Sequence, residues 1–179
     1  SSGVVEVGGV RIDQLSEAKL AAWRARHVGF VFQMYNLLPA LTAERNVELP
    51  LLLTALSGAE RRKNVATALA VVGLADRMKH YPRQLSGGQE QRGGIARAIV
   101  TDPTLLLCDE PTGALDYETG KVVLAAIARV NQQLGTTTVI ITHNAAIAGM
   151  ADRVLRLGGG RIVGEERNAR RLSPEEVRW

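Results

Sequence analysis

The sequence predicts an α/β fold built around a parallel sheet. The chain has 179 residues, of which 46% are hydrophobic, and this is enough for one packed core. No apolar run approaches the roughly twenty residues that a membrane-spanning helix needs. After Pro103, apolar segments alternate with helical patterns, which is typical of a parallel sheet. The strands are expected near 104–108, 137–142, 153–157 and 161–164, and the helices near 117–134 and 144–150. The glycines at 158–160 are expected to form a hairpin turn and not a phosphate loop, since no helix follows them.

The first part of the chain predicts a hairpin, a helix and a strand. The hairpin is expected over residues 4–12, where two glycines supply the turn. Ser16 is placed to cap a helix that ends at about His27. An apolar segment then runs from Val28 to Gln33 and predicts a further strand.

The middle of the chain is predicted to be mostly helical. Ser57 and Glu60 have the spacing of a capping box, and apolar residues follow at helical intervals. We therefore expect a single domain with two lobes. It covers residues 1–179, with a helical subdomain at 34–100 and an α/β lobe made of 1–33 and 101–179.

The segment Leu85-Ser86-Gly87-Gly88-Gln89 places a glycine pair at the start of a predicted helix. Glycines at a helix start allow the backbone to approach a ligand closely. The exposed N–H groups and the positive end of the helix dipole attract anions. The segment therefore predicts a phosphate contact. The alternative is a Ser-Gly-Gly turn that caps an ordinary helix.

Two adjacent carboxylates follow the apolar strand after Pro103. Asp109 and Glu110 lie where ligands bind in parallel α/β proteins, beyond the carboxyl end of a strand. Adjacent residues on a strand point to opposite sides, so the two acids need not share a role. With a nucleoside triphosphate, Asp109 suits Mg²⁺ held through a water, and Glu110 suits the activation of an attacking water. The alternative is that both carboxylates cap the next turn.

Two other predicted strands also end in polar side chains. His143 follows the strand at 137–142, and Gln33 ends the strand that begins at Val28. Because each is delivered by an apolar strand, both are expected to meet the ligand of the carboxylate pair. A lone histidine is also common as a structural residue, which is the alternative for His143.

Together these segments resemble the nucleotide-binding subunit of ATP-binding cassette (ABC) transporters. The resemblance follows the family's order and spacing over nearly the whole chain. It implies a P-loop NTPase, RecA-like core with a parallel sheet, a helical subdomain and a small antiparallel β part. The matching motifs are the Q-loop at Gln33, the signature at Leu85–Gln89, the Walker B strand at Leu105–Glu110, the D-loop at Ala114–Asp116 and the switch histidine His143.

Longer segments around these motifs resemble the MacB, LolD and FtsE branch of this family. The resemblance is carried by Phe32–Pro39, Asn46–Leu51 and Glu110–Asp116. Members of that branch serve lipoprotein release, macrolide or peptide export, or cell-division signalling. The resemblance thus implies ATP-driven export or translocation of a lipoprotein, peptide or drug by a membrane partner, and it selects no substrate.

The resemblance also implies ATP, Mg²⁺ and a second nucleotide-binding subunit that packs head to tail. Glu110 would be the catalytic base, and His143 would hold the γ-phosphate and the attacking water. Gln33 and Asp109 would contact Mg²⁺, the latter through a water, and Asp116 would act across the interface. The signature would bind the partner's nucleotide. The implied ATP-binding residues are Gln33, Ser86, Gly87, Gly88, Gln89, Asp109 and Asp116.

The same resemblance implies a membrane partner. The loop from Met34 to Leu41, which follows Gln33, would receive a coupling helix of an integral membrane permease subunit. The expected location is therefore cytoplasmic, peripheral on the inner face of the cell membrane.

The phosphate-binding loop of the family, Gly-x-x-x-x-Gly-Lys-Ser/Thr, does not occur in these residues. Its backbone amides cradle the phosphates, and its lysine reaches the β and γ groups. Residues 2–10 resemble the segment that follows the P-loop helix. We therefore expect an N-terminally truncated domain that is inactive alone and whose sheet has apolar surface left uncovered.

Charge and cysteine content limit the kinds of partner and the compartment that we expect. The net charge is +4, but the arginines alternate with glutamates and lack the aromatic neighbours of a stacking platform. This distribution favours a solvated surface, so no nucleic-acid partner is expected. The single cysteine, Cys108, lies in an apolar strand and is interpreted as a small core residue in a reducing compartment.

Two other classes of function stay open beside the transporter ATPase. One is a degenerate interaction module that hydrolyses nothing and docks on a membrane subunit or an intact ATPase. The other is a DNA-repair ATPase of the SMC type, which would need long coiled-coil insertions, and the chain has no heptad run.

One departure from the family lies inside the signature helix. Gly93 and Gly94 occupy positions where the family usually has an apolar residue and an alanine. Each glycine costs a helix about 1 kcal/mol relative to alanine. From the sequence alone we expect Gly93→Val combined with Gly94→Ala to raise the melting temperature.

Overall fold

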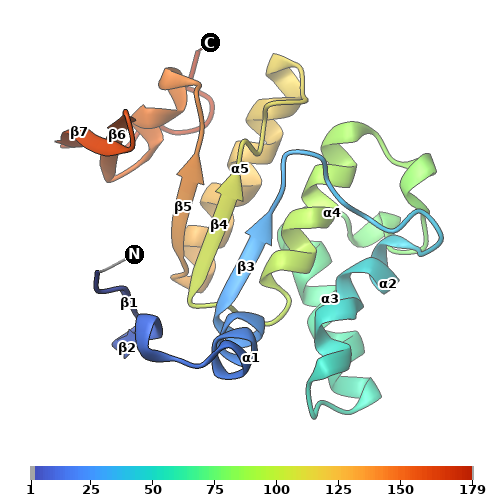
Figure 1. The fold of residues 1–179 in the computed structure, drawn as a ribbon. Helices are drawn as coiled ribbons and strands as arrows, with labels where there is room; N and C mark the ends of the chain where they lie inside the picture. The colour runs from blue at the N-terminus through green and yellow to red at the C-terminus, as the bar shows by residue number, and fades with distance from the viewer. Residues whose placement is uncertain (1–2, 179) are drawn as a thin grey trace.

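A three-stranded parallel sheet forms the centre of the computed structural model, which describes residues 3–178 (Figure 1). The strands are β3 (Val28–Val31), β4 (Leu105–Asp109) and β5 (Thr137–Ile141), with β4 in the middle. All three point to the same edge in Figure 1. The predicted α/β class and parallel sheet are therefore confirmed.

One face of the sheet packs against α4 (Gly87–Ile99) and α5 (Tyr117–Leu134). Alternate strand residues point into this core, because side chains of a strand alternate between its faces. Val31, Leu106 and Cys108 are buried there, and burial raises the pKa of the Cys108 thiol to about 12. Gly29 has no room for a side chain, since a Cβ would lie 2.3 Å from the Ala98 carbonyl oxygen.

The segment between β3 and α4 is largely helical, as expected. It contains α2 (Ala43–Glu48) and α3 (Gly58–Val71), which contact each other and α4. Both bonds of the predicted capping box between Ser57 and Glu60 are present. The loop at 32–42 forms no helix. Short 3-10 helices complete the region at Leu49–Leu53, Ala75–Arg77 and Pro82–Gln84.

The N-terminal part has the predicted order of elements. A hairpin pairs β1 (Glu6–Val7) with β2 (Val10–Arg11), and a 3-10 helix follows at Ile12–Gln14. Ser16 is the N-cap residue of α1 (Glu17–His27), although its side chain makes no capping hydrogen bond. Ser1, Ser2 and Trp179 of the expected domain lie outside the described residues, as does Ser2 of the segment 2–10.

The C-terminal strands form the hairpin that the glycines at 158–160 predicted, but they do not continue the parallel pattern of the strands before them. β6 (Arg153–Gly158) and β7 (Arg161–Arg167) pair antiparallel as a separate hairpin and do not join the parallel sheet. Only two residues separate them, and Gly159 and Gly160 adopt the positive φ of a tight turn. The expected helix at 144–150 is a 3-10 helix, Ala145–Met150.

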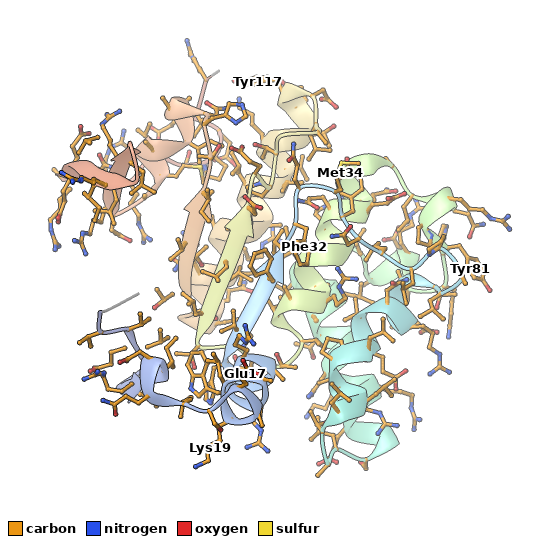
Figure 2. The ribbon with its side chains drawn as sticks, viewed as in Figure 1. Glu17, Lys19, Phe32, Met34, Tyr81 and Tyr117 are labelled. Atoms are coloured by element: carbon orange, nitrogen blue, oxygen red, sulfur yellow. The ribbon has the colours of Figure 1, made fainter. Side chains whose placement is uncertain are left out.

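The second face of the parallel sheet carries exposed apolar side chains. Phe30, Val139 and Ile141 are 38%, 42% and 54% exposed. In Figure 2 Phe32 lies at the end of β3, with Met34 in the loop that follows. Within residues 3–178 no helix is long and apolar enough to cross a bilayer.

Candidate functional site

The carboxyl end of β4 delivers two carboxylates in different backbone conformations. Asp109 is the last strand residue and is exposed, paired in register with Ile141. Glu110 has a φ of 45°, in the left-handed region, and its N–H donates to the Ile141 carbonyl oxygen at 2.9 Å. Strand alternation therefore stops at Asp109. The direction of Glu110 comes from a backbone turn, which the sequence-based argument did not foresee.

Glu110 is held by the residues that follow β5. Its Oε1 lies 2.7 Å from His143 Nδ1 and accepts the His143 backbone N–H at 2.8 Å. Its Oε2 accepts the Thr142 hydroxyl at 3.1 Å. Burial opposes ionisation of Glu110, but the bonds from His143 and Thr142 outweigh it and lower the pKa of this carboxyl. Glu110 is thus an anion at neutral pH, in contact with an exposed histidine.

Gln33 lies near this pair, although β3 ends two residues before it. Its side chain borders Gly113, because a Cβ placed on Gly113 would lie 2.9 Å from Gln33 Nε2. The same point lies 3.4 Å from the Cβ of Glu110. The structure therefore brings Gln33, Glu110 and His143 together at the carboxyl edge of the sheet, with Asp109 at the end of the central strand.

The start of α4 has the geometry of a capping box. Ser86 Oγ accepts the backbone N–H of Gln89 at 3.4 Å, and Gln89 Oε1 accepts the Ser86 N–H at 2.9 Å. The side chains that flank the glycine pair thus bind each other's backbone. The amides of Gly87 and Gly88 belong to the first turn, which has no acceptors inside the helix.

The glycines of this turn are required by neighbouring elements. A Cβ on Gly88 would lie 2.2 Å from the Thr119 methyl carbon of α5, and one on Gly87 would lie 2.8 Å from the Tyr35 hydroxyl. A hollow of about 290 Å³ adjoins this contact. Its lining residues are Ser86, Gly88, Gln89, Arg92, Glu118, Thr119 and Val122.

Asp116 is the N-cap residue of α5. Its carboxylate accepts the Thr119 hydroxyl at 2.6 Å and the Thr119 N–H at 3.0 Å, and these two bonds lower the pKa of Asp116. Because the Thr119 methyl group packs on Gly88, Asp116 and the first turn of α4 share one neighbour.

The sequence-based search missed several residues of this region. Thr142, Thr119 and Tyr35 lie between or beside motif residues and contact them directly. Gln91 is fully buried in α4, where a polar residue on an apolar helix face is itself an indication of a hydrogen-bonding role. For Thr142, the available indication was its place at the carboxyl end of a strand.

The fit to Mg²⁺ follows from the donor types. Asp109 and Gln33 offer carboxylate and amide oxygens, which this ion prefers, and it usually takes only one or two protein carboxylates beside water and phosphate oxygens. Within residues 3–178 no group of three or more His, Cys, Asp or Glu side chains could hold a metal. A site completed by nucleotide phosphates and water suits these residues better than an all-protein cage.

Comparison with known sequences defines the class of protein. Residues 1–113 match the family model described as ABC transporter. The chain is 45% identical over 163 residues to the ABC transporter ATP-binding protein YknY of Bacillus subtilis, covering 91% of this chain and 70% of that protein. The chain therefore belongs to the ATP-binding cassette transporter family.

A second relative and a solved structure narrow the comparison. The chain is 45% identical over 168 residues to the macrolide export ATP-binding/permease protein MacB of Burkholderia pseudomallei, covering 94% of this chain and 26% of that protein. The dimeric ATP-binding cassette MJ0796, solved with ADP and Pi, superposes with a TM-score of 0.79 at 39% identity. That match covers 93% of this chain and 74% of the other. ATP binding and dimer formation are thus properties of the family to which this cassette belongs.

Proposed function

We propose that the chain is the ATP-binding subunit of a transporter in which ATP binding and hydrolysis drive export, or translocation of a lipoprotein, peptide or drug, by a membrane partner. The observation that carries the proposal is the 2.7 Å contact between Glu110 Oε1 and His143 Nδ1. A carboxylate and an imidazole at the ends of neighbouring parallel strands are placed to act on one water and one phosphate. The similarity to a macrolide exporter supports the export direction.

In this proposal Glu110 is the catalytic base. Its lowered pKa keeps it ionised, so it can accept a proton from the attacking water. His143, 83% exposed at its side chain, holds the γ-phosphate and orients that water. Bound Mg²⁺ supplies neutralisation of phosphate charge. Gln33 and Asp109 would hold it, the carboxylate through a water, because both residues lie at the carboxyl ends of neighbouring parallel strands.

The first turn of α4 would serve a nucleotide on a second subunit. Ser86, Gly87, Gly88 and Gln89 lie on a different element from Glu110, and the helix dipole favours an anion at this turn. The proposed assembly is a head-to-tail dimer in which Asp116 acts across the interface. The dimeric state of the MJ0796 cassette supports it.

A membrane partner would dock beside the Q-loop. A groove of about 1240 Å³ lies beside β3, between α1 and the helical region. Its lining includes Phe32, Asn36 and Leu53. Met34 and Leu53 are 68% and 84% exposed. We propose that this surface, with the loop 34–41, receives a coupling element of the permease subunit on the cytoplasmic side of the membrane.

This docking surface follows the proposed division of the domain. Residues 34–100 would form the helical subdomain, and 1–33 with 101–179 the α/β lobe. The contacts of α2 with α3 support a separate helical region, whereas α4 packs both on these helices and on β3 and α5 of the α/β lobe. The groove would then lie at the boundary of the two lobes, where relative motion reaches the partner.

ATP hydrolysis tests the proposal. The protein is isolated with every residue that its gene encodes, and its rate is compared with that of Glu110→Gln. Loss of the base is expected to lower the rate by about 100-fold or more. Glu165→Gln is the matched control, because Glu165 is an exposed glutamate that pairs with Arg153 on the separate β6–β7 hairpin.

The same preparation separates the two remaining classes. Residues 1–179 by themselves contain no phosphate-binding loop and are expected to hydrolyse no ATP. If ATP changes neither the melting temperature nor the turnover of the whole protein, the transporter ATPase is wrong and a non-hydrolysing interaction module takes its place.

A further inference from the structure

Gln91 is a fully buried amide in α4, two residues beyond the signature. Its Nε2 donates to the Phe32 carbonyl oxygen at 3.0 Å and to the Pro111 carbonyl oxygen at 2.9 Å. These carbonyls belong to the loop after β3 and to the loop after β4. One side chain therefore ties two loops, far apart in the sequence, to the signature helix.

Both carbonyls adjoin residues of the candidate site. Phe32 directly precedes Gln33, and Pro111 directly follows Glu110. Gln91 thus holds the backbone from which each of these side chains projects. The two loops also meet each other at Gly113, beside which Gln33 and Glu110 both lie.

The orientation of the Gln91 amide follows from its partners. Reversing it would set its oxygen against two carbonyl oxygens, so the nitrogen must face them. The amide oxygen is then buried with no hydrogen-bond partner in the described residues. An apolar side chain of similar length would fill the space without this unpaired acceptor. Packing alone therefore does not account for glutamine here.

Arg97, which lies further along α4 than Gln91, binds the loop after β3 as well. Its guanidinium donates to the carbonyl oxygens of Tyr35 and Asn36, and both residues have positive φ. Between the two attachments Gly94 lets the loop lie close, since a Cβ there would be 3.3 Å from the Tyr35 carbonyl oxygen. The loop 32–36 is therefore held along α4, and Gln91 extends the attachment to the loop after Glu110.

We propose that Gln91 is a positioning residue that links the first turn of α4 to Gln33 and Glu110 within one subunit. A displacement of α4, as on engagement of residues 86–89, moves the Phe32 and Pro111 carbonyls together. The link deepens the proposed function, since it connects the turn that would bind one nucleotide with the groups that would act on another.

Hydrogen exchange on the present chain tests the link without ATP. Gln91→Met keeps the volume and removes both donors. Peptides covering 32–37 and 110–115 are both expected to exchange about tenfold faster, because each loses a bond to α4. Asn131→Leu is the matched control, since the side-chain amide of Asn131 also donates a hydrogen bond, 2.9 Å long, to the backbone carbonyl of Thr136. It should leave both peptides unchanged. Faster exchange in only one loop, or in neither, would overturn the proposal.

Two further measurements cover the remaining outcomes. If Gln91→Met does not fold, hydrogen exchange in the wild-type chain tests the link instead. The peptides 32–37 and 110–115 should then exchange at rates equal within about threefold. Unrelated rates would overturn the link. In the whole protein, Gln91→Met should lower kcat for ATP about tenfold and leave KM within about twofold. Absence of wild-type hydrolysis would count against the proposed function only, whereas equal kcat with unchanged exchange would count against the link.

Discussion

The first turn of α4 and the carboxyl end of β4 carry the two strongest indications of phosphate chemistry in the sequence. Their side chains have different kinds of partners in the structure. At the first turn, Ser86 and Gln89 bind each other's backbone and Gly88 packs on Thr119. At β4, Glu110 and His143 bind each other at the surface of the sheet edge.

The difference indicates which property of the protein a substitution in each region is expected to change. The glycines of α4 are necessary for packing whether or not a nucleotide binds, so their substitution is expected to lower the free energy of unfolding. The contact at the edge of the sheet joins two ionisable groups near solvent. Loss of this contact is expected to remove a small contribution to stability above the pKa of Glu110 and so to flatten the pH dependence below it.

The largest effect is expected for Gly88→Ala. A Cβ at 2.2 Å from the Thr119 methyl carbon forces α4 and α5 apart, and such overpacking should lower the free energy of unfolding by about 2 kcal/mol. Urea denaturation measures the change.

Thr119→Ser supplies the control for that variant. It removes the clashing methyl group and keeps the hydroxyl that bonds Asp116. The double variant should therefore recover most of the lost stability. Equal stability of Gly88→Ala and wild type would contradict a close contact between α4 and α5 at this position.

Gly93→Val with Gly94→Ala comes next, and the structure reverses the sign expected from helix propensity. A Cβ on Gly94 would press on the Tyr35 carbonyl oxygen at 3.3 Å, and one on Gly93 would meet a Leu37 methyl carbon at 3.1 Å. Valine adds two methyl groups to the second contact. We expect the free energy of unfolding to fall by about 1 kcal/mol in spite of the propensity gain.

Calorimetry checks this prediction, with Gly93→Ala as the comparison. Its single methyl group meets only the mobile end of the Leu37 side chain, so its melting temperature should equal or exceed that of wild type. A higher melting temperature for the double variant would restore the expectation based on sequence.

A smaller effect is expected for Ser86→Ala. The lost cap should cost about 0.5 kcal/mol, because the bond from Gln89 N–H to Ser86 Oγ is long and exposed. Ser57→Ala is a matched control, since Ser57 caps α3 through the same pair of bonds. Thermal melting compares the two. A much larger loss at Ser86 would show that its hydroxyl has a structural role beyond capping.

The smallest effect is a pH dependence from Glu110. Its pKa is lowered from 4.5 in the folded protein, so its contribution to stability is present above 4.5 and is lost as the pH falls through the folded value. Glu110→Gln removes this contribution. Urea midpoints measured between pH 5.5 and pH 3 should therefore fall more steeply for wild type than for the variant, and parallel curves would contradict the lowered pKa.

The order of elements was predictable from local patterns. Apolar strands, the capping box at Ser57 and the hairpin glycines depend on spacing over a few residues, and each appears where expected. The placement of β6 and β7 outside the parallel sheet was not predictable, because alternation of strands and helices does not specify which strands pair.

For the candidate site, the sequence alone determined the residue types and the strands that deliver them. Gln33, Glu110 and His143 meet because parallel strands end at one edge, which local pattern implies. Only the tertiary structure decided that Glu110 turns out of its strand, that Gly88 and Gly94 are spacers for neighbouring elements, and that Gln91 joins two loops. These features depend on contacts between segments distant in the chain, and such contacts leave no local periodicity in the sequence.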